Sequence, residues 1–167
     1  MTSLLAVALT ACVRQAPQRP STRLGQAPEP DTAQLALMEF NRRMAAAADD
    51  EVTRYAQATG QAYALYDNCT WMWVYDRGNE DEPVIREKDR TQLHLRVYDL
   101  SEKLMADIER QYTVGHMELP PAVESNIIYL HPRAKARLIA PWYTAYGTTG
   151  TEGVPPYTNV IIDLEIQ

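Results

Sequence analysis

The residue types that most often do chemistry in proteins are few and scattered in this chain. Its three histidines, His94, His116 and His131, lie far apart, and its two cysteines are Cys12 and Cys69. None of these residues has the short, regular spacing of zinc ligands. The sequence therefore predicts no metal site and no bound cofactor, and it offers no Cys/His cluster for nucleophilic catalysis.

The most distinctive stretch is the carboxy-terminal one, which reads AYGTTGTEGVPPYTNVIIDLEIQ from Ala145 to Gln167. One aromatic residue, Tyr146, precedes a loop of Gly, Thr and Pro, and a strand-like alternation then runs to the last residue. Glycine permits backbone angles that other residues resist, and proline stiffens the chain. The composition therefore predicts a loop of fixed backbone geometry between Tyr146 and a terminal strand.

The amino terminus resembles a secretion signal over residues 1–11. Leu4–Cys12 is a short apolar run that ends in small residues and a cysteine. It is too short to span a bilayer, which takes about 20 apolar residues, but it has the length of a signal-peptide core. Its last four residues, Leu9–Cys12, resemble the lipobox of bacterial lipoproteins, which implies cleavage before Cys12 and lipid on that residue. The first three residues lack the usual Lys or Arg, and the alternative is a buried apolar segment of the fold.

Residues 12–30 have the composition of a tether. Four of the eleven prolines lie between Val13 and Pro30, where large apolar residues are almost absent. Such a segment cannot bury enough surface to offset the entropy of ordering. No acidic residue follows Cys12 until Glu29, whereas surface-exported lipoproteins of Bacteroidota commonly carry acidic residues there. The resemblance to lipoproteins thus implies attachment through lipid to the bacterial outer membrane, facing the periplasm.

Residues 31–60 read as a helical lead-in. Asp31 and Gln34 have the spacing of a capping box, which starts a helix. Apolar residues then recur at helical intervals until Gly60. This stripe comprises Leu37, Phe40, Met44, Ala47, Val52 and Tyr55. The acidic run Asp49–Glu51 suits a second helix start, so we expect one or two helices here, packed on the domain or on a partner chain.

After Gly60 the apolar period becomes two, which is typical of strands. The alternating segments are Trp71–Tyr75, Gln92–Leu100, Ala134–Ala140 and Val160–Ile166. Pro120 opens a short helical pattern, because proline is tolerated in a first helical turn. The apolar positions of that pattern are Val123, Ile127 and Leu130. Together they predict an α+β domain over residues 61–167, with a curved antiparallel sheet packed on one short helix.

The carboxy-terminal stretch is the part that resembles a known family. The segment KARLIAPWYTAYGTTGTEGVPPYTNVIIDLEI resembles the carboxy-terminal half of peptidyl-prolyl cis-trans isomerases of the FK506-binding-protein (FKBP) type. The residues that match the family pattern in order are Pro141, Ala145, Tyr146, Gly147, Pro155, Pro156, Asp163 and Glu165. The resemblance implies an FKBP-like fold for residues 61–167 and proline-containing polypeptides as substrates. More narrowly, the lipidated tether, the helical lead-in and the aromatic first strand resemble gliding-motility-associated isomerase lipoproteins of Bacteroidota.

The resemblance also implies the residues of a proline pocket. In the family the loop tyrosine hydrogen-bonds a substrate carbonyl, and Tyr146 holds that position as the candidate catalytic residue. The residues that align with the pocket lining are Tyr98, Met105, Leu119, Pro120, Val123, Thr151, Val154 and Ile162. Isomerisation needs no nucleophile, because a site that binds the twisted amide better than the planar one lowers the barrier.

Several of these residues depart from the family pattern. Pro120 aligns with a residue whose backbone N–H contacts the ligand, and proline has no N–H. Val123 stands where the family has a tryptophan, and Ile162 stands where it has an aromatic residue. Met105 stands near a family phenylalanine. Because each aromatic contact contributes about 0.5–1.5 kcal/mol, the changes predict a slower enzyme.

Two functions therefore stay open at the level of sequence. The first is a lipid-anchored isomerase that assists the folding of exported envelope proteins. The second is a catalytically degenerate binding or structural module of an outer-membrane assembly, such as motility or secretion machinery. Nucleic acid is not an expected partner of either, because phosphate binding needs a basic surface and the net charge is −6.

Overall fold

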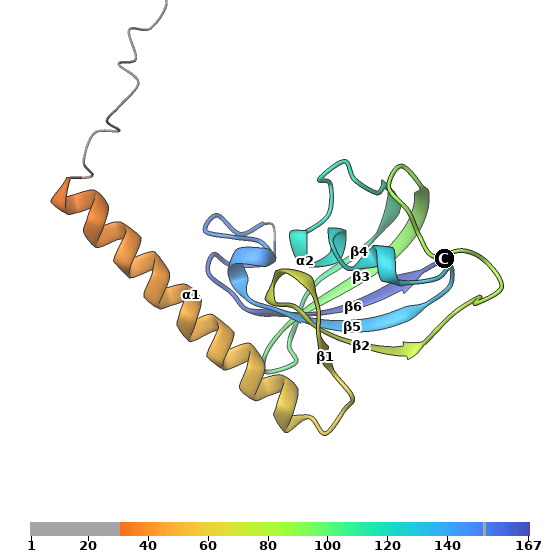
Figure 1. Ribbon diagram of the computed structural model, residues 1–167, viewed down its shortest axis with the longest axis horizontal. Coiled ribbons are helices and arrows are strands. Elements are labelled where there is room, and N and C mark those ends of the chain that lie inside the picture. The colour runs from red at the N-terminus through yellow and green to blue at the C-terminus, as the bar shows by residue number, and fades with distance from the viewer. Residues whose placement is uncertain (1–30, 152) are drawn as a thin grey trace, which may run out of the picture.

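Six strands form one antiparallel sheet, which confirms the predicted α+β architecture (Figure 1). The computed structural model describes residues 31–151 and 153–167, so the predicted signal peptide, Cys12 and the tether lie outside the described residues. The strands are β1 (Ala64–Leu65), β2 (Trp71–Asp76), β3 (Arg90–Asp99), β4 (Leu104–Thr113), β5 (Lys135–Ala140) and β6 (Val160–Ile166). Their spatial order is β1-β2-β5-β6-β3-β4, so the carboxy-terminal strand lies inside the sheet.

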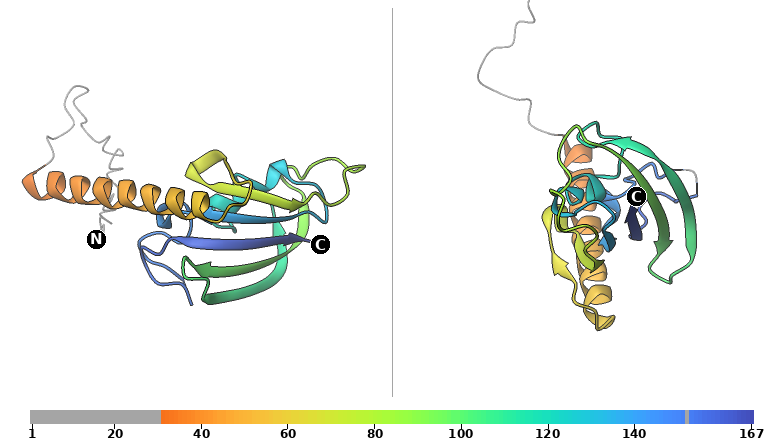
Figure 2. Two further views of the ribbon diagram at one scale, coloured as in Figure 1. Left: turned by 90° about the horizontal axis from the view of Figure 1, so that it is seen from below. Right: turned by 90° about the vertical axis from the view of Figure 1, so that its right-hand side faces the viewer.

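Within the described residues, two α-helices and three 3-10 turns accompany the sheet. The helices are α1 (Thr32–Ala58) and α2 (Pro121–Glu124), and the turns are η1 (Asp67–Cys69), η2 (Ile127–Tyr129) and η3 (Trp142–Thr144). The short helix α2 and η2 cover one face of the sheet, here called the inner face, while α1 lies against the other (Figures 1 and 2).

The inner face of the sheet forms the main core. Leu95 and Val97 of β3 pair directly with Leu164 and Ile162 of β6, and all four are at most 1% exposed. The segment from α2 to η2 adds Val123, Ile127 and Leu130 to the same cluster, at the predicted helical spacing. The inward-facing residues of the strands, which recur every second position, therefore pack against helical residues that recur every three or four positions.

The outer face is covered in part by the second half of α1. Val52 and Ala56 pack against Ile139 of β5 and Ile161 of β6, and all four side chains are at most 2% exposed. Because Ile139 and Ile161 point away from the main core, they would face solvent without α1. This packing joins α1 to the domain predicted for residues 61–167.

Polar contacts fix α1 in place beside this apolar patch. Tyr143 donates a hydrogen bond to the carboxylate of Asp49. Asn159 donates to Glu51 at 2.6 Å and accepts from the backbone N–H of Trp142 at 2.9 Å. The acidic run that suggested a second helix start therefore makes tertiary contacts, and α1 continues through it as one helix.

The start of α1 is as predicted, but the predicted apolar stripe is buried only in the second half of the helix. Asp31 accepts from the backbone of Gln34, and Gln34 reaches back to the Asp31 N–H, so the capping box is present. The buried residues are Ala48, Val52 and Ala56. Leu37 and Phe40 of the predicted stripe are 60% and 47% exposed, because the first half of α1 extends beyond the sheet (Figures 1 and 2).

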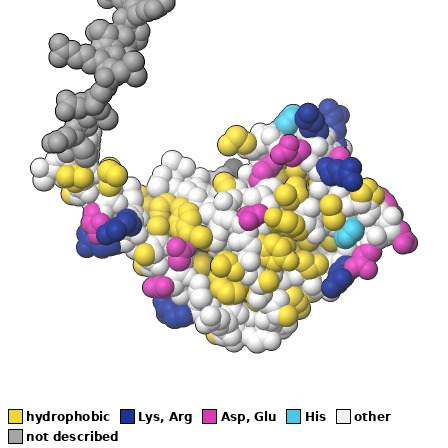
Figure 3. Space-filling view, viewed as in Figure 1, with side chains coloured by type: hydrophobic (Ala, Val, Ile, Leu, Met, Phe, Trp, Pro, Cys, Tyr) yellow, Lys and Arg dark blue, Asp and Glu magenta, His cyan; other side chains and the backbone are white. Residues whose placement is uncertain are grey.

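The surface of the described region is mixed in character. Hydrophobic side chains gather along α1 and over the middle of the domain, with charged side chains toward the periphery (Figure 3). Among the described helices, none combines the length and apolar character needed to cross a bilayer.

Candidate proline-binding site

A hollow of about 540 Å³ lies beside Tyr146, on the inner side of β3 and β4. Its walls come from these strands, from the segment before α2 and from the loop after η3. The lining residues are Leu95, Met105, Ala106, Asp107, Ile108, Arg110, Tyr112, Glu118, Pro120, Tyr146, Thr151 and Gly153. Four predicted pocket residues thus meet at one place, namely Met105, Pro120, Tyr146 and Thr151.

The loop that follows Tyr146 owes its shape to glycine. Gly153 has φ +89°, and an added Cβ would lie 2.5 Å from the carbonyl oxygen of Met105. Gly150 has φ +67°, and its Cβ would lie 2.4 Å from the carbonyl of Val154. Side chains at either position would push the loop away from β4 or open its own turn. The loop therefore closes one side of the hollow because these residues are glycines.

Tyr146 stands half-buried at the wall of the hollow. Burial raises the pKa of its hydroxyl to about 12, with a smaller contribution from the neighbouring Tyr112. No hydrogen bond to another described group contributes to that pKa. The hydroxyl therefore stays protonated at neutral pH, and it can donate to a carbonyl placed in the hollow.

Strand β4 supplies most of the remaining wall, although its alternation was not recognised in the sequence. Ile108 and Tyr112 point inward, and the guanidinium of Arg110 lies 4.6 Å from the centre of the Tyr112 ring. Between Val97 and Tyr98 of β3 the register shifts by one residue, which bulges Met105 toward the hollow. A bulge of this kind redirects a side chain that strict alternation would send to the other face.

Five predicted lining residues lie outside the wall of this hollow, and four of them belong to the main core. Val123, Val154 and Ile162 are at most 1% exposed and belong to the main core. Leu119 is also buried, and it lines a neighbouring groove instead. Because Val123 is fully enclosed, replacing it by tryptophan to restore the family pattern would overpack the core, at a cost of about 1–3 kcal/mol.

The predicted placement of Tyr98 is wrong. Tyr98 packs against the outer cluster with Ile139 and Ile161, on the face that α1 covers. Its neighbours Leu95 and Val97 are the inward-facing residues, and successive side chains of a strand alternate between faces. Leu95 is the residue of β3 that reaches the hollow.

Leu95, Ile108 and Tyr112 are apolar or aromatic lining residues that sequence reasoning missed. Leu95 carried a signal, because it lies in phase with Leu93 and Val97 in the alternating segment. Tyr112 lies in phase with Ala106, Ile108 and Arg110, and the small and charged members of that series hide the alternation. The hollow therefore keeps two aromatic residues, Tyr112 and Tyr146.

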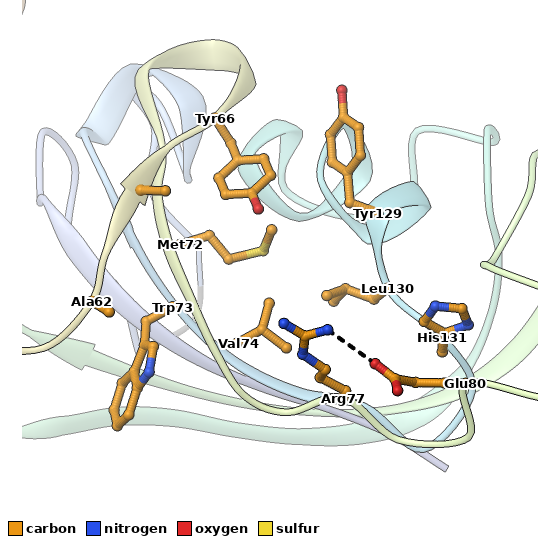
Figure 4. Close-up of a pocket in the computed structure, with 11 residues that line it drawn as sticks. Ala62, Tyr66, Met72, Trp73, Val74, Arg77, Glu80, Tyr129, Leu130 and His131 are labelled. Atoms are coloured by element: carbon orange, nitrogen blue, oxygen red, sulfur yellow. Dashed lines mark hydrogen bonds and ion pairs between the residues drawn. The ribbon is translucent and has the colours of Figure 1, made fainter.

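A second hollow, of about 340 Å³, lies between β2 and η2 (Figure 4). Met72, Val74 and Leu130 form its floor, while Trp73 turns to the opposite side of β2 (Figure 4). Arg77 and Glu80 form an exposed ion pair of 3.2 Å at one end. It contains none of the predicted site residues, so we place the candidate site at Tyr146.

The candidate site has no constellation for metal or covalent chemistry. Within residues 31–151 and 153–167, no group of three His, Cys, Asp or Glu side chains could hold a metal ion. At the rim, Asp107 contacts His94 with an oxygen–nitrogen distance of 2.5 Å. What the arrangement offers is a cavity with both apolar and polar walls, in which Tyr146 presents a hydroxyl donor.

Comparison with known proteins supports the fold. The chain aligns with FkpA from Escherichia coli at a TM-score of 0.61 and 14% identity, over 83% of this chain and 72% of that one. A peptidyl-prolyl cis-trans isomerase from Pseudomonas syringae gives 0.58 at 17% identity, over 72% and 91%. The N-terminal domain of FKBP42 from Arabidopsis thaliana gives 0.53 at 16% identity, over 62% and 87%.

No protein-family model and no curated protein matches the chain. The three solved structures share its sheet and short helix at low identity, so they establish the architecture and not the activity. The predicted FKBP-like α+β fold is thereby confirmed, and the chain has the fold of FKBP-type peptidyl-prolyl isomerases.

Proposed function

We propose that this chain is a lipid-anchored peptidyl-prolyl cis-trans isomerase of the FKBP type that assists the folding of exported envelope proteins. The observation that carries the proposal is the hollow beside Tyr146, which has Leu95, Met105 and Ile108 in its wall. Among the described residues, no hydrogen bond to the Tyr146 hydroxyl contributes to its pKa. An isomerase fold and a lipobox-like amino terminus add support.

The proposed chemistry follows from the amide bond itself. Rotation about an X–Pro bond faces a barrier of roughly 18–20 kcal/mol, because resonance gives the bond partial double character. The apolar part of the wall would withhold water that stabilises the polar planar amide. The Tyr146 hydroxyl would then donate to a substrate carbonyl, and the site would bind the twisted amide better than the planar forms.

The isomerisation rate of proline-containing peptides tests the proposal. Tyr146→Phe removes only the hydroxyl, and a hydrogen bond contributes about 0.5–1.5 kcal/mol, so we expect a two- to twelvefold loss of kcat/KM. Tyr157→Phe is the matched control, because Tyr157 is exposed and stacks on Trp142 outside the hollow. An inactive parent chain, or equal losses in both variants, would argue against isomerase function.

The lipid anchor is tested separately. If Cys12 carries lipid, the membrane fraction should contain a chain that begins at Cys12 with added acyl mass. Cys12→Ala should leave an unmodified precursor of unchanged length. Detection of an intact Met1 without acyl mass on the parent chain would contradict the anchor.

A second candidate function is a binding or structural module of an outer-membrane assembly, including motility or secretion machinery. Pro120 favours it, because this lining residue has no N–H to offer a ligand. The aliphatic core residues Val123 and Ile162 favour it as well, because they stand where the family has aromatic residues. This function predicts little activity in the parent chain and a cellular phenotype that Tyr146→Phe leaves unchanged.

A further inference from the structure

A groove lies beside the segment that leads into α2, on the side opposite to the Tyr146 hollow. It has a volume of about 470 Å³, and most of its surface is apolar. We call it the acidic-rimmed groove. Its lining residues are Asp67, Asn68, Glu87, Val114, Gly115, Met117, Leu119, Pro121, Glu124, Ser125 and Ile128. Met117 is 89% exposed and Ile128 is 37% exposed, which is unusual for apolar side chains beside a cavity.

The charge of this groove has one sign. Three carboxylates line it, from Asp67, Glu87 and Glu124, and none of the described lining residues is Lys, Arg or His. Asp67 already accepts a hydrogen bond from the Tyr129 hydroxyl at 2.6 Å. A ligand that brings a positive charge would therefore meet three negative groups around an apolar floor.

Glu124 gives a more specific indication. One of its carboxylate oxygens accepts from the backbone N–H of Gly115. The other oxygen is buried, and it has no hydrogen-bond partner among the described residues. A buried acceptor without a partner is costly, and a cationic donor from a ligand would satisfy it.

The groove adjoins the candidate proline site across the segment 117–121. Along residues 117–121 the side chains alternate between the two cavities. Met117, Leu119 and Pro121 line the groove, while Glu118 and Pro120 line the hollow beside Tyr146. One extended polypeptide can therefore contact both cavities across a wall that is a single segment thick.

We propose that the acidic-rimmed groove binds an extended polypeptide segment in which an apolar side chain stands next to a lysine or arginine. The apolar side chain covers Met117, Leu119 and Ile128, and the cation faces Glu87 and Glu124. That the same polypeptide also occupies the Tyr146 hollow rests on the proposed function, whereas binding to the groove requires neither proline nor isomerisation.

Fluorescence anisotropy with short, labelled, proline-free peptides tests the proposal on the full chain. The probe alternates leucine with lysine, one control replaces each lysine by glutamate, and a second replaces each leucine by serine. We expect the lysine–leucine probe to bind at least about tenfold more tightly than either control, and more weakly as salt increases. Equal binding of the three peptides would overturn the proposal.

Matched variants locate the binding. Glu87→Gln and Met117→Ser change exposed side chains of the groove, and each should weaken the probe, by about tenfold when combined. Glu39→Gln and Met38→Ser make the same changes on the projecting half of α1 and should leave binding unchanged. If the α1 pair weakens binding as much as the groove pair, the groove is not the site. Tyr146→Phe should abolish neither binding nor its salt dependence, so this result is separable from the isomerase test.

Discussion

The packing of α1 against the outer face of the sheet makes a quantitative prediction for Val52→Ala. Val52 is 1% exposed and lies against Ile139 and Ile161, which are fully buried. Removing its two methyl groups loses about 1.6 kcal/mol of transfer free energy, at roughly 0.8 kcal/mol for each group. A residual cavity of roughly 50 Å³ adds about 1.2 kcal/mol, at about 24 cal/mol per Å³.

Val52→Ala should therefore lower the free energy of unfolding by about 2–3 kcal/mol, which corresponds to a fall in Tm of about 4–12 °C. Differential scanning calorimetry of the full chain measures it. Leu37→Ala is the control, because Leu37 is 60% exposed on the projecting half of the same helix and should change Tm little. If Val52→Ala changes Tm as little as Leu37→Ala does, α1 is not part of the folded domain, and residues 61–167 would fold without it.

Three further predictions concern the loop, the sheet and alkaline pH. Gly153→Ala should destabilise the chain by about 1–3 kcal/mol and weaken binding at the Tyr146 hollow. Both effects should be smaller for Gly147→Ala, because a Cβ added at Gly147 has open space around it. Asp163→Asn should lower the free energy of unfolding by about 1–3 kcal/mol, because Asp163 accepts two hydrogen bonds from Arg137 at 2.6 and 3.1 Å, whereas Glu39→Gln on exposed α1 should have almost no effect. Burial raises the pKa of Tyr55, Tyr63 and Tyr146 to about 12 each. The folded chain therefore holds these protons more tightly than the unfolded chain, whose tyrosines titrate near pH 10, and stability present below pH 10 should be lost as the pH rises from about 10 to 12. A Tm that is constant across this range would contradict the last prediction.

The strands were predictable where one face is uniformly apolar. Leu93, Leu95 and Val97 alternate with polar residues, and so do the residues of β6, so a period of two is visible in one sequence. Strand β4 was not predictable in this way, because its inward series includes Ala106 and the exposed Arg110, whose guanidinium lies over the Tyr112 ring. The Met105 bulge had no sequence signal, since it arises from the register between β3 and β4.

The candidate site was predictable where the chain itself sets the geometry. Tyr146 and Thr151 lie on a loop whose glycines fix their positions, so local sequence was sufficient. Tyr98 was misplaced because it was matched to a family tyrosine by residue type. Its position in the alternation of β3 decides which face of the sheet it occupies. The helix α1 shows the same limit, since only the sheet beneath it determines that Ala48 and Ala56 are buried while Leu37 is not.

Pro120 is the residue on which the two proposed functions differ most sharply, and its backbone geometry makes it testable. Its φ of −55° and ψ of 139° suit most residues, and they remain allowed before Pro121. Its carbonyl accepts from the N–H groups of Val123 and Glu124 at 2.8 and 2.9 Å, so the start of α2 does not depend on the proline ring. Pro120→Ile should therefore keep the fold and add one N–H at the wall of the hollow. If a bound peptide carbonyl lies there, the new hydrogen bond should raise kcat/KM about two- to twelvefold, at about 0.5–1.5 kcal/mol. An unchanged rate at unchanged Tm would mean that no carbonyl approaches this wall, and the binding-module function would then account better for the site.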